Sequence, residues 1–121
     1  MRYFIYFRNP EYAKILKEQY PNSSIKNTVS ELFGICFQDH DVYIIDAHYG
    51  VSDMSDLNGL NVAYSLLQSF LRARVNAKIC LLSWFTKEYM TKSSPFAQEL
   101  SSSNKIEFYQ LPLMQNNYER K

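Results

Sequence analysis

The sequence has little of what marks disordered, membrane-bound or nucleic-acid-binding chains. It has only 3 Gly and 4 Pro, while 46% of its residues are hydrophobic and 16% aromatic, which is unlike a disordered segment. Its 13 cationic and 12 anionic residues leave a net charge of +1, so nothing favours nucleic acid as a partner. The apolar runs at residues 42–45 and 79–82 fall far short of the ~20 residues that span a bilayer, so we expect no membrane segment.

Cysteine is also scarce. Cys36 and Cys80 form no CxxC pair, and both lie in apolar stretches with no secretory leader before them. We therefore expect buried free thiols in a reducing compartment, which predicts a cytoplasmic protein. A chain of 121 residues has the usual size of one domain, so residues 1–121 are expected to form a single domain.

Apolar runs of strand length recur along the chain, each followed by a polar break. We expect five strands, at residues 3–7, 25–27, 42–45, 79–82 and 106–111. Amphipathic helices between them favour a parallel sheet with helices on both faces, because each crossover between parallel strands needs a helix. The sequence therefore predicts an α/β fold with a five-stranded parallel sheet.

Capping residues mark the helix starts. An apolar stripe continues one predicted helix from Val29 to Phe37, and another predicted helix covers residues 60–72. The capping patterns are Asn9 before Pro10, Thr28 three residues before Glu31, and Ser94 before Pro95.

Polar side chains follow three of the strands, and functional groups gather at the carboxyl ends of strands in such sheets. We expect Arg8 and Asn9, Asp46, Ser83 and Leu111 to line one site there. From the residues alone, Asp46 is either a functional carboxylate or a strand-end aspartate satisfied by loop amides. The guanidinium of Arg8 either pairs with Asp46 or is solvated.

Other chemistry is less well supported by the sequence. His48, Asp53 and Asp56 could form a metal site, but such residues in a polar loop are usually solvated, and no metal or cofactor is expected. Ser83 would need an activating base, and neither histidine has a spacing typical of a triad. We therefore expect no hydrolase.

A segment after the fourth predicted strand is rich in aromatic residues. Trp84, Phe85 and Tyr89 suit either an interaction surface or a cover for the sheet edge.

Several short motifs follow one another between residues 42 and 113. They are Asp46 after a strand, Asn58-Gly59-Leu60, Leu71-Arg72, Leu82-Ser83-Trp84, and Phe108 followed by Pro112. Their order resembles the receiver domain of bacterial response regulators. The resemblance implies a flavodoxin-like three-layer fold in which Asp46 stands at the phosphoacceptor position, Ser83 bonds the phosphoryl oxygen and Phe108 is the switch aromatic.

The sequence departs from that family at its charged positions. Phe7-Arg8-Asn9 stands where receivers carry an acidic pair for Mg²⁺, and Leu111 stands where they carry Lys. We therefore expect a degenerate pseudo-receiver that is no enzyme and binds a protein partner or a second copy without phosphorylation. The alternative is an active phosphoacceptor receiver, or a small metal-dependent phosphoryl-handling enzyme that uses Asp46 with Asp53 and Asp56.

Only nine residues follow Pro112, so we expect a shortened last helix. Leu113, Met114 and Tyr118 are its only apolar contacts. The face near the first helix and the C-terminus should then stay partly uncovered and be buried by a partner, with a homodimer as the default.

Overall fold

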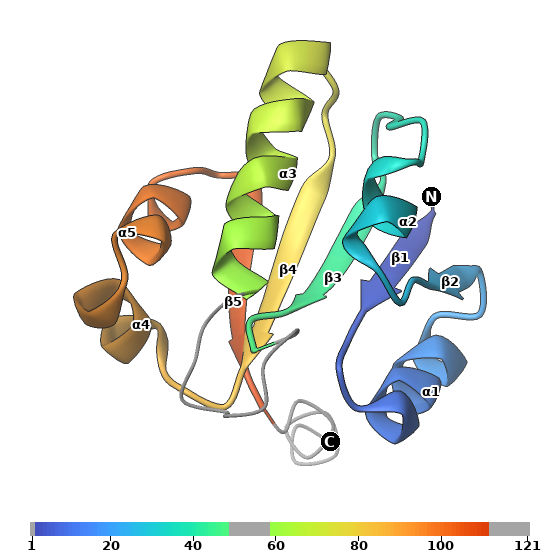
Figure 1. Ribbon diagram of the computed structural model, residues 1–121, viewed down its shortest axis with the longest axis horizontal. Helices are drawn as coiled ribbons and strands as arrows, with labels where there is room; N and C mark the ends of the chain where they lie inside the picture. Colours follow the sequence, from blue (N-terminus) through green and yellow to red (C-terminus); the bar gives the residue numbers. More distant parts are fainter. Residues whose placement is uncertain (1, 49–58, 112–121) are drawn as a thin grey trace, which may run out of the picture.

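The computed structural model describes residues 2–48 and 59–111. A wholly parallel sheet with strand order β2-β1-β3-β4-β5 forms its centre (Figure 1). This arrangement confirms the predicted α/β class with five parallel strands. The strands are β1 (Tyr3–Tyr6), β2 (Ser23–Ile25), β3 (Val42–Asp46), β4 (Lys78–Ser83) and β5 (Ile106–Gln110).

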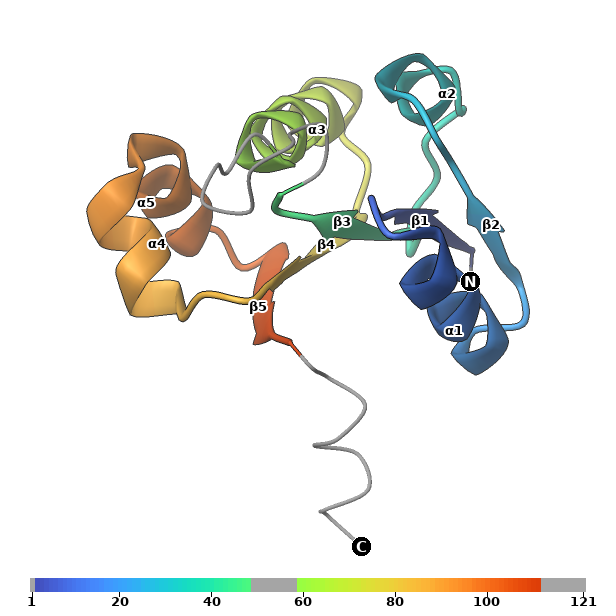
Figure 2. The ribbon, with the colours of Figure 1, turned by 60° about the horizontal axis from the view of Figure 1, so that its bottom comes forward.

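Helices cover both faces of the sheet, which gives three layers. Figure 2 shows α1 on one face and α2 and α3 on the other. The last two helices, α4 and α5, pack with α3 through the same core cluster beside β5. The helices are α1 (Pro10–Gln19), α2 (Val29–Phe33), α3 (Gly59–Ala73), α4 (Lys87–Ser93) and α5 (Pro95–Ser101).

Three predicted caps are present and explain where helices begin. The side chain of Asn9 accepts hydrogen bonds from the first-turn N–H groups of α1, and Ser94 does the same for α5. Thr28 and Glu31 form a capping box at the start of α2.

The second helix is shorter than its apolar stripe predicts. It ends at Phe33, because Gly34 closes it as the C-cap, so the predicted continuation to Phe37 is wrong. Phe37 instead leaves the helix and packs its ring against Tyr43 and Phe70, with centroids 6.0 and 5.2 Å away.

Two further predictions need correction. Cys36 is exposed and Cys80 is half-buried, so the expected pair of buried thiols is wrong, although both are free. The second strand begins two residues earlier than expected, because Ser23 pairs in register with Tyr3. The sequence also gave no expectation of α4, which is capped by Thr86 and anchored by the buried Met90.

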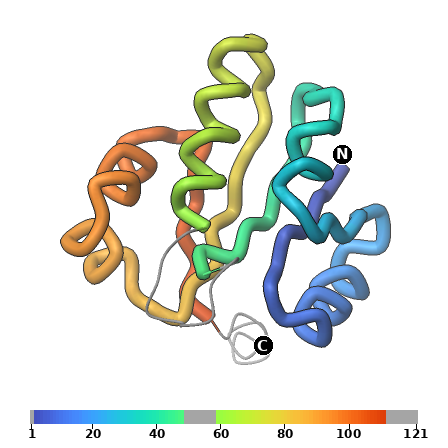
Figure 3. Tube along the Cα trace, viewed as in Figure 1, coloured from blue at the N-terminus to red at the C-terminus, as the bar shows by residue number. Residues whose placement is uncertain are grey.

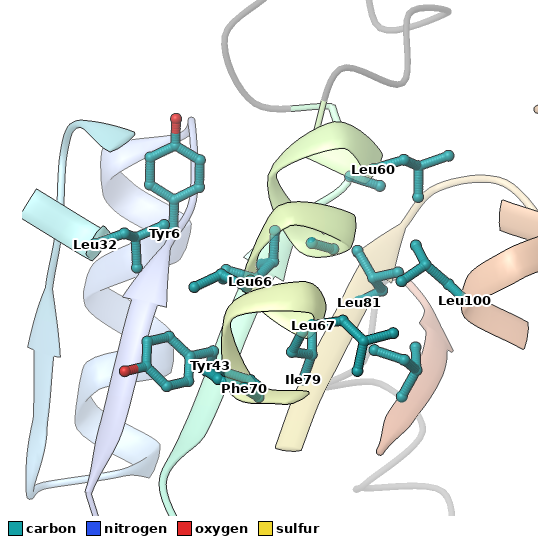
Figure 4. Close-up of a cluster of buried hydrophobic side chains, with 14 of the residues drawn as sticks. Tyr6, Leu32, Tyr43, Leu60, Leu66, Leu67, Phe70, Ile79, Leu81 and Leu100 are labelled. Carbon is teal, nitrogen blue, oxygen red and sulfur yellow. The ribbon is translucent and has the colours of Figure 1, made fainter. Parts of the chain in front are cut away.

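Two apolar clusters hold the layers together, one on each face of the sheet. The larger lies beneath α3, with Phe70 among its fully buried side chains (Figure 4). The smaller lies beneath α1 and joins Leu16, Ile44 and Leu111. Within the described residues, no helix has both the length and the apolar content that a membrane span requires.

The path of the chain creates a natural site at one edge of the sheet. β1 leads outward to β2, and the chain then crosses back over β1 to begin β3 (Figure 3). The loops after β1 and β3 therefore leave the sheet in opposite directions, at the switch point where ligands bind in open α/β sheets.

Candidate functional site

Four strand ends bring the predicted site residues to the carboxyl edge of the sheet. Asp46 is the last residue of β3, and Ser83 is the last residue of the neighbouring β4. Arg8 and Asn9 follow β1, and Leu111 follows β5. Asn9 is committed to capping α1, because its side-chain oxygen accepts from the N–H groups of that helix.

Both carboxylate oxygens of Asp46 are held by backbone amides. Oδ2 accepts from the N–H of Arg8 at 2.9 Å, and Oδ1 accepts from the N–H of His48 at 2.8 Å. Asp46 is only 4% exposed. The sequence left open whether Asp46 is a functional carboxylate or a strand-end aspartate satisfied by loop amides. The contacts in the structure are those of the second alternative.

An ion pair between the guanidinium of Arg8 and Asp46, one of the two alternatives that the sequence left open, is not present among the described residues. The Arg8 contact runs through its backbone N–H instead, because β1 ends directly beside the carboxylate. Among the described residues the ion pairs are Arg2–Asp41 and Lys78–Glu107, and both lie elsewhere.

Gly59 closes the site from the side of α3. Its N–H donates to the carbonyl of Ala47 at 2.8 Å, so the helix begins directly against the turn after Asp46. A Cβ atom at this position would lie 2.0 Å from the carbonyl oxygen of Asp46, far inside van der Waals contact. The glycine is therefore required by the close approach of two backbone segments.

His48 and Ser83 form a pair that sequence spacing did not reveal. His48 Nε2 lies 3.0 Å from Ser83 Oγ and accepts from the N–H of Trp84 at 3.4 Å. The direction of the bond between His48 and Ser83 depends on the tautomer of the imidazole ring. Ser83 Oγ in turn accepts from the N–H of Phe85 at 2.9 Å.

The spacing of the histidines in the sequence thus did not reveal that His48 lies beside Ser83. The missing signal was register, since Asp46 pairs with Leu82 and this places the end of β4 beside the turn after β3.

This pair nevertheless lacks access to a substrate. Ser83 is 0% exposed and His48 is 1% exposed. The ring of Phe85 packs edge-on against His48 with centroids 5.1 Å apart, and Tyr89 packs on Phe85 at 4.9 Å. A nucleophile must reach the reacting atom, so this geometry supports a structural joint between β3 and β4.

A small hollow lies over Asp46. Its volume of about 130 Å³ is below the ~300–1,000 Å³ of typical small-molecule sites. The rings of Phe7 and Tyr12 stack in its wall with centroids 5.0 Å apart. The hollow is lined by Phe7, Arg8, Asn9, Tyr12, Asp46, His48 and Trp84.

The remaining predicted residues fall into three groups. Leu111 is buried in the cluster beneath α1, and its N–H donates to the carbonyl of Ser83 at 2.7 Å. Phe108 is half-buried, with Lys87 Nζ 5.2 Å from its ring centroid. Asp53, Asp56 and the predicted shortened last helix lie outside the described residues. Within the described ranges, no group of three His, Cys, Asp or Glu side chains could hold a metal ion.

Comparisons with known proteins support the fold. The sequence matches no protein family and none of the curated proteins. The structure is similar to the crystal structure of a response regulator from Colwellia psychrerythraea, with a TM-score of 0.63 and 15% sequence identity over 99% of this chain and 98% of that one. The chain therefore has the flavodoxin-like α/β fold of a response-regulator receiver.

Proposed function

We propose that this protein is a receiver-like signalling module of the two-component type that binds a protein partner without being phosphorylated. The fold of a response regulator supports the class of module. The observation that carries the proposal is the state of Asp46, whose two oxygens are each bonded to a backbone N–H in a buried place. The proposed module is cytoplasmic and non-enzymatic, and it needs no cofactor.

Phosphoryl transfer to a carboxylate needs an accessible oxygen and a cation that offsets the gathering negative charge. Each carboxylate oxygen of Asp46 already accepts a backbone N–H, and the 130 Å³ hollow above it has little room for a phosphoryl donor. Arg8 and Asn9 replace the acidic pair that receivers use for Mg²⁺, and the side chain of Leu111 is apolar and buried. Each of these features opposes phosphorylation.

In this proposal Asp46 has a structural role. Its two bonds tie the loop after β1 to the turn after β3, so one charged group orders both sides of the switch point. Hydrogen bonds to a charged group are roughly twice as strong as neutral ones. In this proposal the switch point keeps one conformation, whereas a receiver changes between two conformations on phosphorylation.

Exposed aromatic rings beside the sealed site suit a protein partner. Trp84 is 41% exposed and Tyr89 is 52% exposed, while Met90 takes the buried position of α4. Aromatic side chains of this kind are enriched among the residues that carry binding energy in interfaces.

Intact-mass analysis after incubation with acetyl phosphate and Mg²⁺ tests the proposal. We expect no added phosphoryl group on the wild-type chain, with an active receiver as the positive control for the reagent. A stoichiometric gain of one phosphoryl group that is lost in Asp46→Asn would contradict the proposal and favour the active phosphoacceptor.

A further inference from the structure

A second hollow lies on the face of the sheet that carries α1, toward the amino ends of the strands. Among the described helices only α1 covers this face, over β1 and β2, so β4 and β5 are left without a helix above them (Figure 2). The hollow has a volume of about 390 Å³. We call it the amino-edge groove; it is lined by Tyr3, Tyr20, His40, Asp41, Val42, Asn76, Lys78, Cys80, Glu107 and Tyr109.

Aromatic and apolar side chains form part of the lining of the amino-edge groove. Tyr3 and Tyr20 stack with ring centroids 4.6 Å apart. Cys80 is half-buried, and Tyr109 is 38% exposed although its strand lies in the sheet. An open apolar surface of this kind on a folded domain commonly marks an interaction site.

Charges of both signs stand side by side in the same groove. Lys78 Nζ lies 3.3 Å from Glu107 Oε2, and the Tyr109 hydroxyl donates to Glu107 Oε1 at 2.6 Å. The Lys78 and Glu107 side chains remain 56% and 39% exposed, so each can still reach a second partner. A surface that carries one cation next to one anion is complementary to itself after a two-fold rotation.

We propose that the amino-edge groove is the surface through which two copies of this chain associate, with Lys78 of each copy facing Glu107 of the other. The inference rests on the proposed function, because it specifies the partner of a module that binds without phosphorylation. The exposed charges of the groove balance, because the third charged residue of its lining, Asp41, is buried and paired with Arg2. This balance favours a second copy as the occupant. A strongly acidic or basic partner would leave either Lys78 or Glu107 against a like charge.

The proposed dimer needs no covalent link. Burial, with the nearby carboxylate of Glu107, raises the pKa of the Cys80 thiol to about 12, so the thiolate that forms disulfides is scarce at neutral pH.

Charge-swap variants can separate contacts between copies from contacts within one copy. Lys78→Glu places two carboxylates in the groove, and Glu107→Lys places two ammonium groups there. Each variant has lost the internal pair, so mixing the two cannot restore it inside either chain. Only a contact between the two different chains can bring opposite charges together.

Native mass spectrometry and light scattering at micromolar concentration give the readout. We expect the wild-type chain to be a dimer, each variant alone to be monomeric, and an equimolar mixture to form a dimer with one chain of each kind. Lys92→Glu, on α4 away from the groove, should remain dimeric as the matched control. Circular dichroism should show that all variants are folded, because the exchanged side chains are largely exposed.

Three results would overturn the inference. One is a wild-type chain that stays monomeric, as it would if its own residues 112–121 filled the groove. The others are folded variants that do not pair when mixed, and a dimer that Lys92→Glu also breaks. None of these results would revive phosphorylation of Asp46, so failure of the dimer and failure of the proposed function remain distinguishable.

Discussion

The carboxyl and amino edges of the sheet differ in how far their charged side chains are exposed to solvent. At the carboxyl edge Asp46 is 4% exposed, and backbone N–H groups hold both of its oxygens. At the amino edge Glu107 and Lys78 pair with each other and stay largely open to solvent. In parallel sheets functional groups usually lie at the carboxyl edge, yet here the carboxylate at that edge is buried and the exposed ion pair lies at the other end.

The interactions at the two edges also differ in how much they contribute to stability. Hydrogen bonds to charged groups contribute about 1.5–3 kcal/mol each, while an exposed ion pair contributes only about 0–1 kcal/mol. Substitutions at the carboxyl edge should therefore change the stability of the fold, and substitutions at the amino edge should change association with little effect on stability.

The largest effect is expected at Gly59. Gly59→Ala puts a methyl group 2.0 Å from the Asp46 carbonyl, so α3 must shift or the turn after β3 must open. We expect a loss of about 3 kcal/mol or more, or a chain that does not fold, because backbone atoms cannot move aside as a side chain end can. Urea denaturation followed by circular dichroism measures this loss.

Gly34→Ala is the matched control. Its Cβ would lie 3.1 Å from the Ser30 carbonyl, and the backbone φ of Gly34 is an ordinary −79°. The free energy of unfolding should change by no more than about 1 kcal/mol. Equal losses for the two variants would contradict the close backbone contact described for the carboxyl edge.

Ser83→Ala should have the next largest effect. It removes the acceptor for the N–H of Phe85 and the hydroxyl bonded to His48, and Ser83 and His48 are both buried. Leaving buried polar groups unpaired costs about 1–3 kcal/mol, so we expect a loss in that range by urea denaturation. Ser102→Ala, on the exposed end of α5, should change stability by less than about 0.5 kcal/mol. Tolerance of Ser83→Ala at the level of this control would show that the joint is not structural.

The smallest effect is expected at Glu107 and depends on pH. The hydrogen bond from Tyr109, together with Lys78, lowers the pKa of Glu107 below its usual value. The stabilisation is therefore complete above the ordinary carboxyl pKa of about 4.3 and is lost as the pH falls through the lowered value. Because the side chain is 39% exposed, solvent screening keeps this contribution below about 1 kcal/mol.

Glu107→Gln cannot titrate at this position. The stability difference between wild type and Glu107→Gln should therefore shrink as the pH falls from 7 toward 3, which denaturation curves at several pH values can follow. A difference that stays constant or grows on acidification would contradict the assigned sign.

Apolar runs of strand length and helix-capping residues predicted most of the fold from the sequence. The apolar run that became β3 and the caps at Asn9 and Thr28 depend on neighbours within a few residues, so local patterns reveal them. The end of α2 was missed, because the apolar stripe to Phe37 continues past the glycine that stops the helix.

The site was harder to predict than the fold. Parallel topology correctly predicted that Arg8 lies near Asp46. It did not predict that the backbone N–H of Arg8 makes the contact. The bond between His48 and Ser83 joins residues 35 positions apart, and strand register sets it. The exposed pair of Lys78 and Glu107 likewise depends on which residues of β4 and β5 face the same side, which no local pattern encodes.

The central claim, that the carboxylate at the carboxyl edge is closed by the backbone, can be tested most directly on the two N–H groups that close it. Two-dimensional ¹H–¹⁵N spectra recorded while Mg²⁺ is added through the physiological millimolar range would report on the Arg8 and His48 amides. We expect neither resonance to move or broaden, since Asp46 is 4% exposed and backbone N–H groups already bond both of its oxygens. Saturable shifts at these two amides, absent in Asp46→Asn, would show that the carboxylate opens to metal and would contradict the account.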